Sequence, residues 1–135
     1  MCFMTWEPAF SVGDEELDRQ HMRLIGLVNS LQDAKLAGAP RPALDRIASD
    51  LSMYSRLHFR NEENLLRFHC YPAIDTHIEE HAVFTTQMDH FMADLRRGQQ
   101  VIPESLLGFM KSWLGAHLAE ADAGYALFLT SRRAA

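Results

Sequence analysis

The feature that most constrains the fold of this chain is a set of four stretches in which apolar residues recur at alternating spacings of three and four. That spacing places one residue per turn on a single helix face, as in helices packed together in a bundle. The stripe positions are Leu17, His21, Leu24, Val28 and Leu31; Leu44, Ile47, Leu51, Tyr54, His58 and Leu65; Ile74, His77, His81, Phe84, Met88, Phe91 and Leu95; and Leu106, Met110, Trp113 and His117. They predict four helices, over roughly residues 14–37, 42–69, 73–97 and 103–130.

Three short segments rich in Gly and Pro separate the stretches: LAGAPRP from Leu36, CYP from Cys70 and RGQQVIP from Arg97. Such residues end helices, and short connections make consecutive helices antiparallel neighbours. The sequence therefore predicts an all-α, up-down-up-down antiparallel four-helix bundle. We expect a single domain over residues 1–135 with an N-terminal arm over residues 1–13, and no further domain.

Composition and charge exclude several classes of function. The 135 residues carry a formal net charge of −5, so no basic field favours nucleic acid or an anionic membrane. No apolar run approaches the ~20 residues of a membrane span, and the first ten residues lack the features of a signal peptide. Cys2 and Cys70 give no disulfide framework, and we interpret Cys70 as a buried or idle thiol. These features predict a cytoplasmic protein without membrane insertion.

Five of the stripe positions hold histidine where leucine or phenylalanine would be expected: His21, His58, His77, His81 and His117. A single inward histidine is most often a core residue that is hydrogen-bonded to a neighbour. Five in one small core would leave many buried donors and acceptors to satisfy, at roughly 1–3 kcal/mol for each one left unmade. A bound metal removes that difficulty.

The histidines also fall at one height of the predicted bundle. Antiparallel helices mirror each other about their connection, so facing residues lie equally far from it. His21 and His58 are equidistant from the first connecting segment. The histidines of the second and third helices mirror each other about the second segment, and those of the third and fourth about the third. The sequence thus predicts one layer of histidines that draws on all four helices.

Two carboxylates complete the candidate ligands. Glu62 follows His58 by four residues, so both side chains can point into one pocket. Asp122 follows His117 by five residues, which in a regular helix would rotate it ~140° off the same face. For both to bind, the last helix must break or widen into a π-type turn between them. Taken alone, Asp122 would be a surface acid near a helix end.

Counting donors indicates which metal such a layer would hold. Five imidazoles and two carboxylates are too many for one zinc ion, which usually takes four ligands. Two octahedral ions that share both carboxylates and an oxide or hydroxide bridge would keep one position open. The open position would fall on the ion with fewer histidines. Imidazole–carboxylate ligation with an open position suits iron that meets a small molecule such as O2.

Four segments, SVGDEELDRQH, HFRNEE, YPAIDTHIEEH and WLGAHLAEADAGY, together resemble the bacterial hemerythrins, a family of non-haem di-iron proteins that bind O2. The resemblance covers nearly the whole chain and fills every position of the family's ligand motif. It implies two iron ions that are bridged by two carboxylates and an oxo or hydroxo group. The implied ligands are His77, His81 and His117 for one iron, His21 and His58 for the other, and Glu62 and Asp122 as the bridges.

Several neighbours of the expected ligands fit such a centre. Leu24, Phe59, Trp113 and Leu114 could form a dry pocket for O2, although ordinary core packing explains each of them equally well.

Gln20, Glu63 and Tyr125 are candidate partners for the outer N–H groups of the ligand imidazoles, with surface exposure as the alternative. By their helical positions, we expect His69 and His90 not to be ligands.

The function expected from these observations is reversible O2 binding for carriage, storage or delivery. Five neutral imidazoles favour this role over oxygenase chemistry, which generally uses carboxylate-rich sites. Two alternatives remain open. One is an O2 or redox sensor that acts through a protein partner, which the sequence does not identify. The other is a di-iron enzyme that reduces peroxide or nitric oxide.

Overall fold

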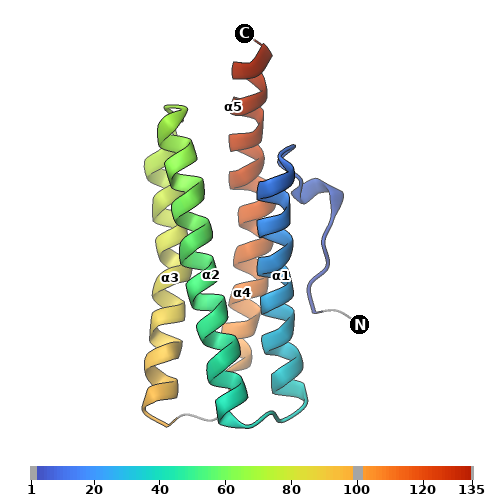
Figure 1. The fold of residues 1–135 in the computed structure, drawn as a ribbon, viewed down its shortest axis with the longest axis vertical. Helices are drawn as coiled ribbons and strands as arrows, with labels where there is room; N and C mark the ends of the chain where they lie inside the picture. The colour runs from blue at the N-terminus through green and yellow to red at the C-terminus, as the bar shows by residue number, and fades with distance from the viewer. Residues whose placement is uncertain (1–2, 99–101, 135) are drawn as a thin grey trace.

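The computed structural model describes residues 3–98 and 102–134, except for the side chains of residues 121, 122 and 132–134. Its helices form four antiparallel columns, so the predicted all-α four-helix bundle with an N-terminal arm is confirmed (Figure 1). After the short 3-10 helix η1 (Pro8–Phe10), the columns are α1 (Glu15–Leu36), α2 (Arg41–Phe68), α3 (Ile74–Arg96), and a fourth that consists of α4 (Glu104–Ala116), the π-helical segment η2 (His117–Ala121) and α5 (Asp122–Ala134).

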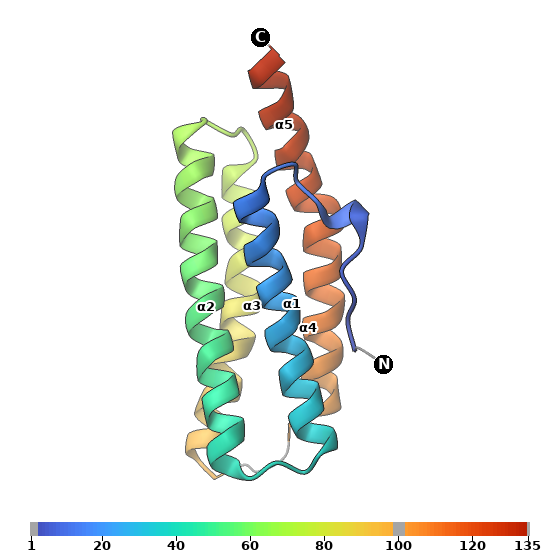
Figure 2. The same cartoon turned by 45° about the vertical axis from the view of Figure 1, so that its right-hand side comes forward.

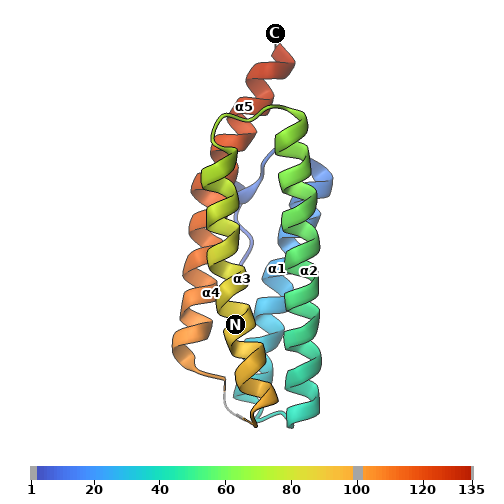
Figure 3. The same ribbon diagram turned by 90° about the vertical axis from the view of Figure 1, so that its left-hand side faces the viewer.

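Each column packs against the one before and the one after it, and α4 also packs against α1, which closes the ring (Figures 2 and 3). The turn between α1 and α2, the end of α3 and the start of α4 lie at one end, which we call the glycine end (Figure 1). The turn between α2 and α3 lies at the other, which we call the histidine end; α5 extends beyond it. Gly38 and Gly98 adopt positive φ angles of 62° and 99° at the glycine end, and Cys70 adopts 55° at the histidine end.

The N-terminal arm runs along the bundle beside α1 and α4 (Figure 2). Asn29 of α1 holds it through both backbone groups of Met4, because the Met4 N–H donates to Asn29 Oδ1 and Asn29 Nδ2 donates to the Met4 carbonyl, each at 2.8 Å. The side chains of Met4 and Phe10 are buried in the core. Asp14 then caps α1 by accepting a hydrogen bond from the Leu17 N–H at 3.0 Å.

The core consists of two apolar clusters on either side of the histidines. The larger one reaches the glycine end and includes Val28, Leu31 and Leu51, all of which are fully buried. The smaller one, at the histidine end, includes Leu66 and Tyr125. Water is therefore excluded from both sides of the layer between them. Within the described residues, no helix is both long and apolar enough to cross a membrane.

Candidate metal centre

The structure brings six of the seven predicted metal ligands together in one buried layer. The side chains of His21, His58, Glu62, His77, His81 and His117 are each exposed by 4% or less. Their possible ligand atoms form two groups, each within 4.8 Å: His21, His58 and Glu62 in one, and Glu62, His77, His81 and His117 in the other. We call these the two-histidine group and the three-histidine group. They match the division between two irons that the family resemblance implies, and Glu62 belongs to both.

The two oxygens of Glu62 face different groups. Oε2 lies 3.3 Å from Nε2 of His21 and 3.3 Å from Nε2 of His58. Oε1 lies 3.1 Å from Nε2 of His81, 3.7 Å from Nε2 of His117, and in contact with Nε2 of His77. One carboxylate therefore spans the two groups.

Burial raises the pKa of Glu62, but hydrogen bonds with His117, His21, His58 and His77 outweigh it and hold the pKa well below its ordinary value. Glu62 is therefore an anion at neutral pH, in the middle of five imidazoles. A buried anion surrounded by imidazoles is suited to a cation.

The outer nitrogens of three imidazoles contact polar side chains from neighbouring positions of the bundle. His58 Nδ1 lies 2.5 Å from Gln20 Oε1, and His81 Nδ1 lies 2.8 Å from Glu63 Oε2. These two contacts confirm the roles predicted for Gln20 and Glu63 as hydrogen-bond partners. Gln20 also donates from Nε2 to Glu16 at 3.1 Å, which turns its carbonyl oxygen towards the imidazole.

The third contact was missed from the sequence. His117 Nδ1 lies 3.2 Å from Glu80 Oε2. The sequence does hold a signal for this contact. Glu80 and His117 lie equally far from Gly98 to within one residue, so they fall at the same height of the bundle, as the histidines do. Glu80 is 42% exposed and belongs to no inward stripe, so the helical pattern alone gives no reason to select it.

The hydrogen bonds to the Nδ1 atoms determine which nitrogen of each imidazole can bind a metal. A carboxylate only accepts, so Glu63 and Glu80 require His81 and His117 to carry their protons on Nδ1. The Nε2 atom of each ring then points inwards, where the loss of its own proton makes it a metal ligand. These two Nε2 atoms are 3.1 Å apart and both face the Glu62 carboxylate. A cation that takes the place of the protons between these nitrogens and Glu62 would be held by several donors at once. The residues present thus fit a metal, and imidazole with carboxylate is a donor set that suits iron.

The fourth column shows the irregularity that the spacing of His117 and Asp122 predicts. Residues His117–Ala121 form a π-helical segment between two α-helices, which confirms the predicted π-type turn. Asp122 begins α5. The structure does not describe the Asp122 side chain, so the role of its carboxylate as a ligand stays a prediction.

The four residues predicted to form a pocket all lie in or against the larger apolar cluster. The Phe59 ring stacks on His81, with centroids 4.1 Å apart, and the Trp113 ring stacks on His117 at 4.6 Å. Leu24 and Leu114 are each 2% exposed. The two aromatic rings thus cover imidazoles of the three-histidine group, whereas the open position was expected beside the other group. Their role in an O2 pocket stays a prediction.

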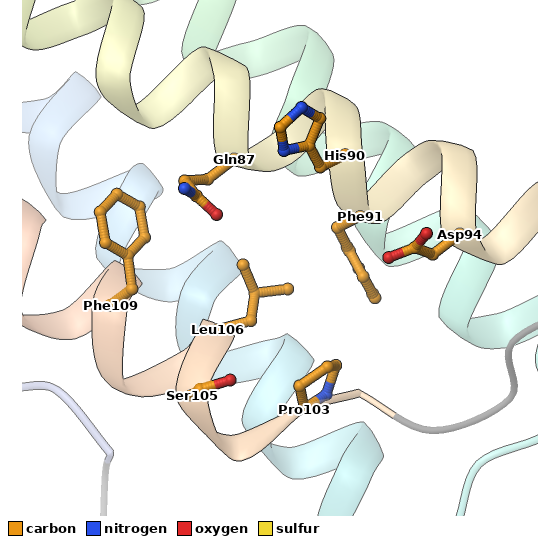
Figure 4. Close-up of a pocket in the computed structure, with 8 residues that line it drawn as sticks. All are labelled: Gln87, His90, Phe91, Asp94, Pro103, Ser105, Leu106 and Phe109. Carbon is orange, nitrogen blue, oxygen red and sulfur yellow. The ribbon is translucent and has the colours of Figure 1, made fainter.

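The remaining candidates, Tyr125, His69 and His90, are not members of the two groups. Tyr125 is fully buried, with its ring 5.9 Å from that of Tyr71, and its predicted hydrogen bond to a ligand imidazole stays a prediction. His69 ends α2 and His90 is exposed on α3, and neither belongs to the two groups. His90 and Phe91 help to line a surface hollow of about 310 Å³ between α3 and α4, to which no residue of either group contributes (Figure 4).

Comparisons with known proteins agree with this architecture. The family model of the hemerythrin HHE cation-binding domain matches residues 12–128. A bacteriohemerythrin of Pseudomonas aeruginosa is 29% identical over 125 residues, which cover 93% of this chain and 80% of the relative. A hemerythrin-like protein of Naegleria gruberi is 29% identical over 121 residues, which cover 89% and 88%. A crystal structure of wild-type hemerythrin superimposes with a TM-score of 0.87 at 25% identity, covering 94% of this chain and 98% of that one.

Fold and site together define a metal-binding four-helix bundle whose buried histidines and glutamate fit a non-haem di-iron centre. The match over residues 12–128 makes the assignment more specific: the chain belongs to the hemerythrin family.

Proposed function

We propose that this protein binds O2 reversibly at a non-haem di-iron centre, for carriage, storage or delivery. His77, His81 and His117 would hold one iron, His21 and His58 the other, and Glu62 and Asp122 would bridge them together with an oxo or hydroxo group. Two ferrous ions supply the electrons and the coordination position with which a small diatomic molecule such as O2 binds and is released. The observation that carries the proposal is the convergence of imidazole nitrogens on both oxygens of Glu62.

Neighbouring residues orient the ligand imidazoles and exclude water from the layer. Glu63, Glu80 and Gln20 fix the ring orientation of three ligands through their outer nitrogens. Phe59 and Trp113 stack on two of these rings. Together with the apolar clusters on both sides, they keep water from the layer, which favours release of O2 over oxidation of the centre.

The direct test is the absorption spectrum of the anaerobically reduced, iron-loaded protein as O2 is admitted and then purged. We expect a ligand-to-iron charge-transfer band that appears with O2 and fades on purging. Immediate and irreversible oxidation would contradict reversible binding. Steady consumption of peroxide or nitric oxide that requires the irons would instead favour an enzyme.

The ligand assignment is tested by counting irons. His58→Ala removes a buried member of the two-histidine group and should prevent loading of two irons per chain. His90→Ala, a histidine on the exposed face of α3, is the matched control and should keep both. Two irons and a normal O2 spectrum in His58→Ala would overturn the assignment.

A further inference from the structure

The two histidine groups differ in the charge of the side chains that contact their outer nitrogens. In the three-histidine group, His81 and His117 face the carboxylates of Glu63 and Glu80. In the two-histidine group, His58 faces the neutral amide of Gln20. Gln20 Nε2 in turn donates to the carboxylate of Glu16.

This difference changes how strongly each ring donates electrons to a metal. A carboxylate that accepts the Nδ1 proton pulls it away from the ring and makes Nε2 a more basic ligand, and an amide carbonyl does so more weakly. A more basic ligand set stabilises the higher oxidation state of an ion. Two carboxylates act on the three-histidine group, and the Nδ1 atom of His58 in the two-histidine group contacts an amide.

We propose that Glu63 and Glu80 are positioning residues that polarise His81 and His117, so that the iron of the three-histidine group retains its ferric state more strongly than it would with amides at these two positions. The inference rests on the proposed di-iron centre. The two carboxylates would thereby lower the reduction potential of that ion before any ligand binds.

The geometry ranks the two carboxylates. Glu63 contacts its imidazole at 2.8 Å and is 18% exposed, whereas Glu80 contacts its own at 3.2 Å and is 42% exposed. Water screens the more exposed charge, and a longer hydrogen bond shifts the proton less. Glu63 should therefore act more strongly than Glu80. Each of these side chains also lies in a surface hollow, Glu63 between α2 and α3 and Glu80 between α3 and α4, so a change to an amide leaves the core packing intact.

The test compares midpoint potentials of the iron-loaded protein, measured by spectroelectrochemical titration without O2, for wild type, Glu63→Gln, Glu80→Gln and Gln20→Glu. The loss of one outer carboxylate should lower the ratio of ferric to ferrous affinity about tenfold. This is the lower end of the effect that such partners have on metal affinity. For a one-electron step this corresponds to a rise of about 59 mV. We expect the larger rise for Glu63→Gln, a smaller one for Glu80→Gln, and a fall for Gln20→Glu.

The opposite sign of Gln20→Glu is the control, because a purely structural disturbance would not move the potential up in two variants and down in the third. Potentials that do not change, or that all change in one direction, would overturn the inference. Binding of Zn2+ to the same variants provides a readout without iron chemistry. Glu63→Gln should weaken Zn2+ binding and Gln20→Glu should not, and the reverse order would also contradict the inference. If Zn2+ binds as expected but two irons never load, the proposed function fails instead.

Discussion

The two ends of this bundle are built by the same four columns with the same periodicity, yet their interiors are opposite in kind. Towards the glycine end, the stripes bury residues such as Val28, Leu31 and Leu51. About two to three turns closer to the histidine end, the same stripes bury five imidazoles and a carboxylate. Helical spacing therefore determines which residues face inwards, and residue type determines what the interior does there.

The difference separates stability from function. Burial of apolar side chains stabilises the fold without any ligand. When it is metal-free, the histidine layer buries polar groups in place of apolar ones, so it lacks the apolar burial that stabilises the glycine end. We infer that the apolar core towards the glycine end keeps the metal-free protein folded. Metal binding is then the largest single addition to its stability.

The largest expected effect is therefore that of the metal itself. At free metal a thousandfold above its dissociation constant, binding should raise the free energy of unfolding by about 4 kcal/mol. Urea denaturation with and without Zn2+ measures this. A variant that combines His58→Ala, Glu62→Ala and His81→Ala should lose the gain, since it leaves only His21 of the two-histidine group and only His77 and His117 of the three-histidine group. An equal gain in that variant would assign the effect to surface acids.

The next effect tests the glycine end. Leu51 is fully buried and lies about 10 Å along α2 from His58. Leu51→Ala should lower the free energy of unfolding by about 3 kcal/mol, equally in the metal-free and metal-loaded forms. Leu57 on the same helix is 54% exposed, and Leu57→Ala should cost less than ~0.5 kcal/mol. A cost for Leu51→Ala that depends on metal would show that the two ends are coupled.

The sequence predicted the features that depend on one helix or on the symmetry of the connections. These are the helical stripes, the common height of the histidines and the π-type turn after His117. It did not predict the contacts that depend on how neighbouring helices are rotated against each other. The Glu80–His117 hydrogen bond and the stacking of Phe59 and Trp113 on the three-histidine group are of this second kind. Periodicity defines a face, but side-chain direction across an interface also depends on rotamers and helix rotation.

Acid should affect the histidine layer in a way that the apolar end does not share. The pKa of Glu62 in the folded protein lies below its ordinary value of 4.5, so its contribution to stability is complete above pH 4.5. That contribution is lost as the pH falls through the folded pKa. In the metal-free protein, the stability of wild type relative to Glu62→Gln should fall by about 1.4 kcal/mol per pH unit in that window. Parallel stability curves for the two proteins would contradict this sign.

The smallest effect concerns the turns at the two ends. Gly38 and Gly98 meet the need for positive φ at the glycine end, but at the histidine end Cys70 adopts 55° with a Cβ atom. That conformation costs a non-glycine residue ~1–2 kcal/mol, which glycine avoids. Glycine is also more flexible in the unfolded chain, and this offsets part of the gain in stability. Cys70→Gly should therefore stabilise the protein by about 0.5–1 kcal/mol, seen as a higher urea midpoint with an unchanged slope. Cys70→Ala removes the exposed thiol but keeps the Cβ atom, so it should change little. Equal gains in both variants would mean that the thiol, and not the backbone, is the source of the strain.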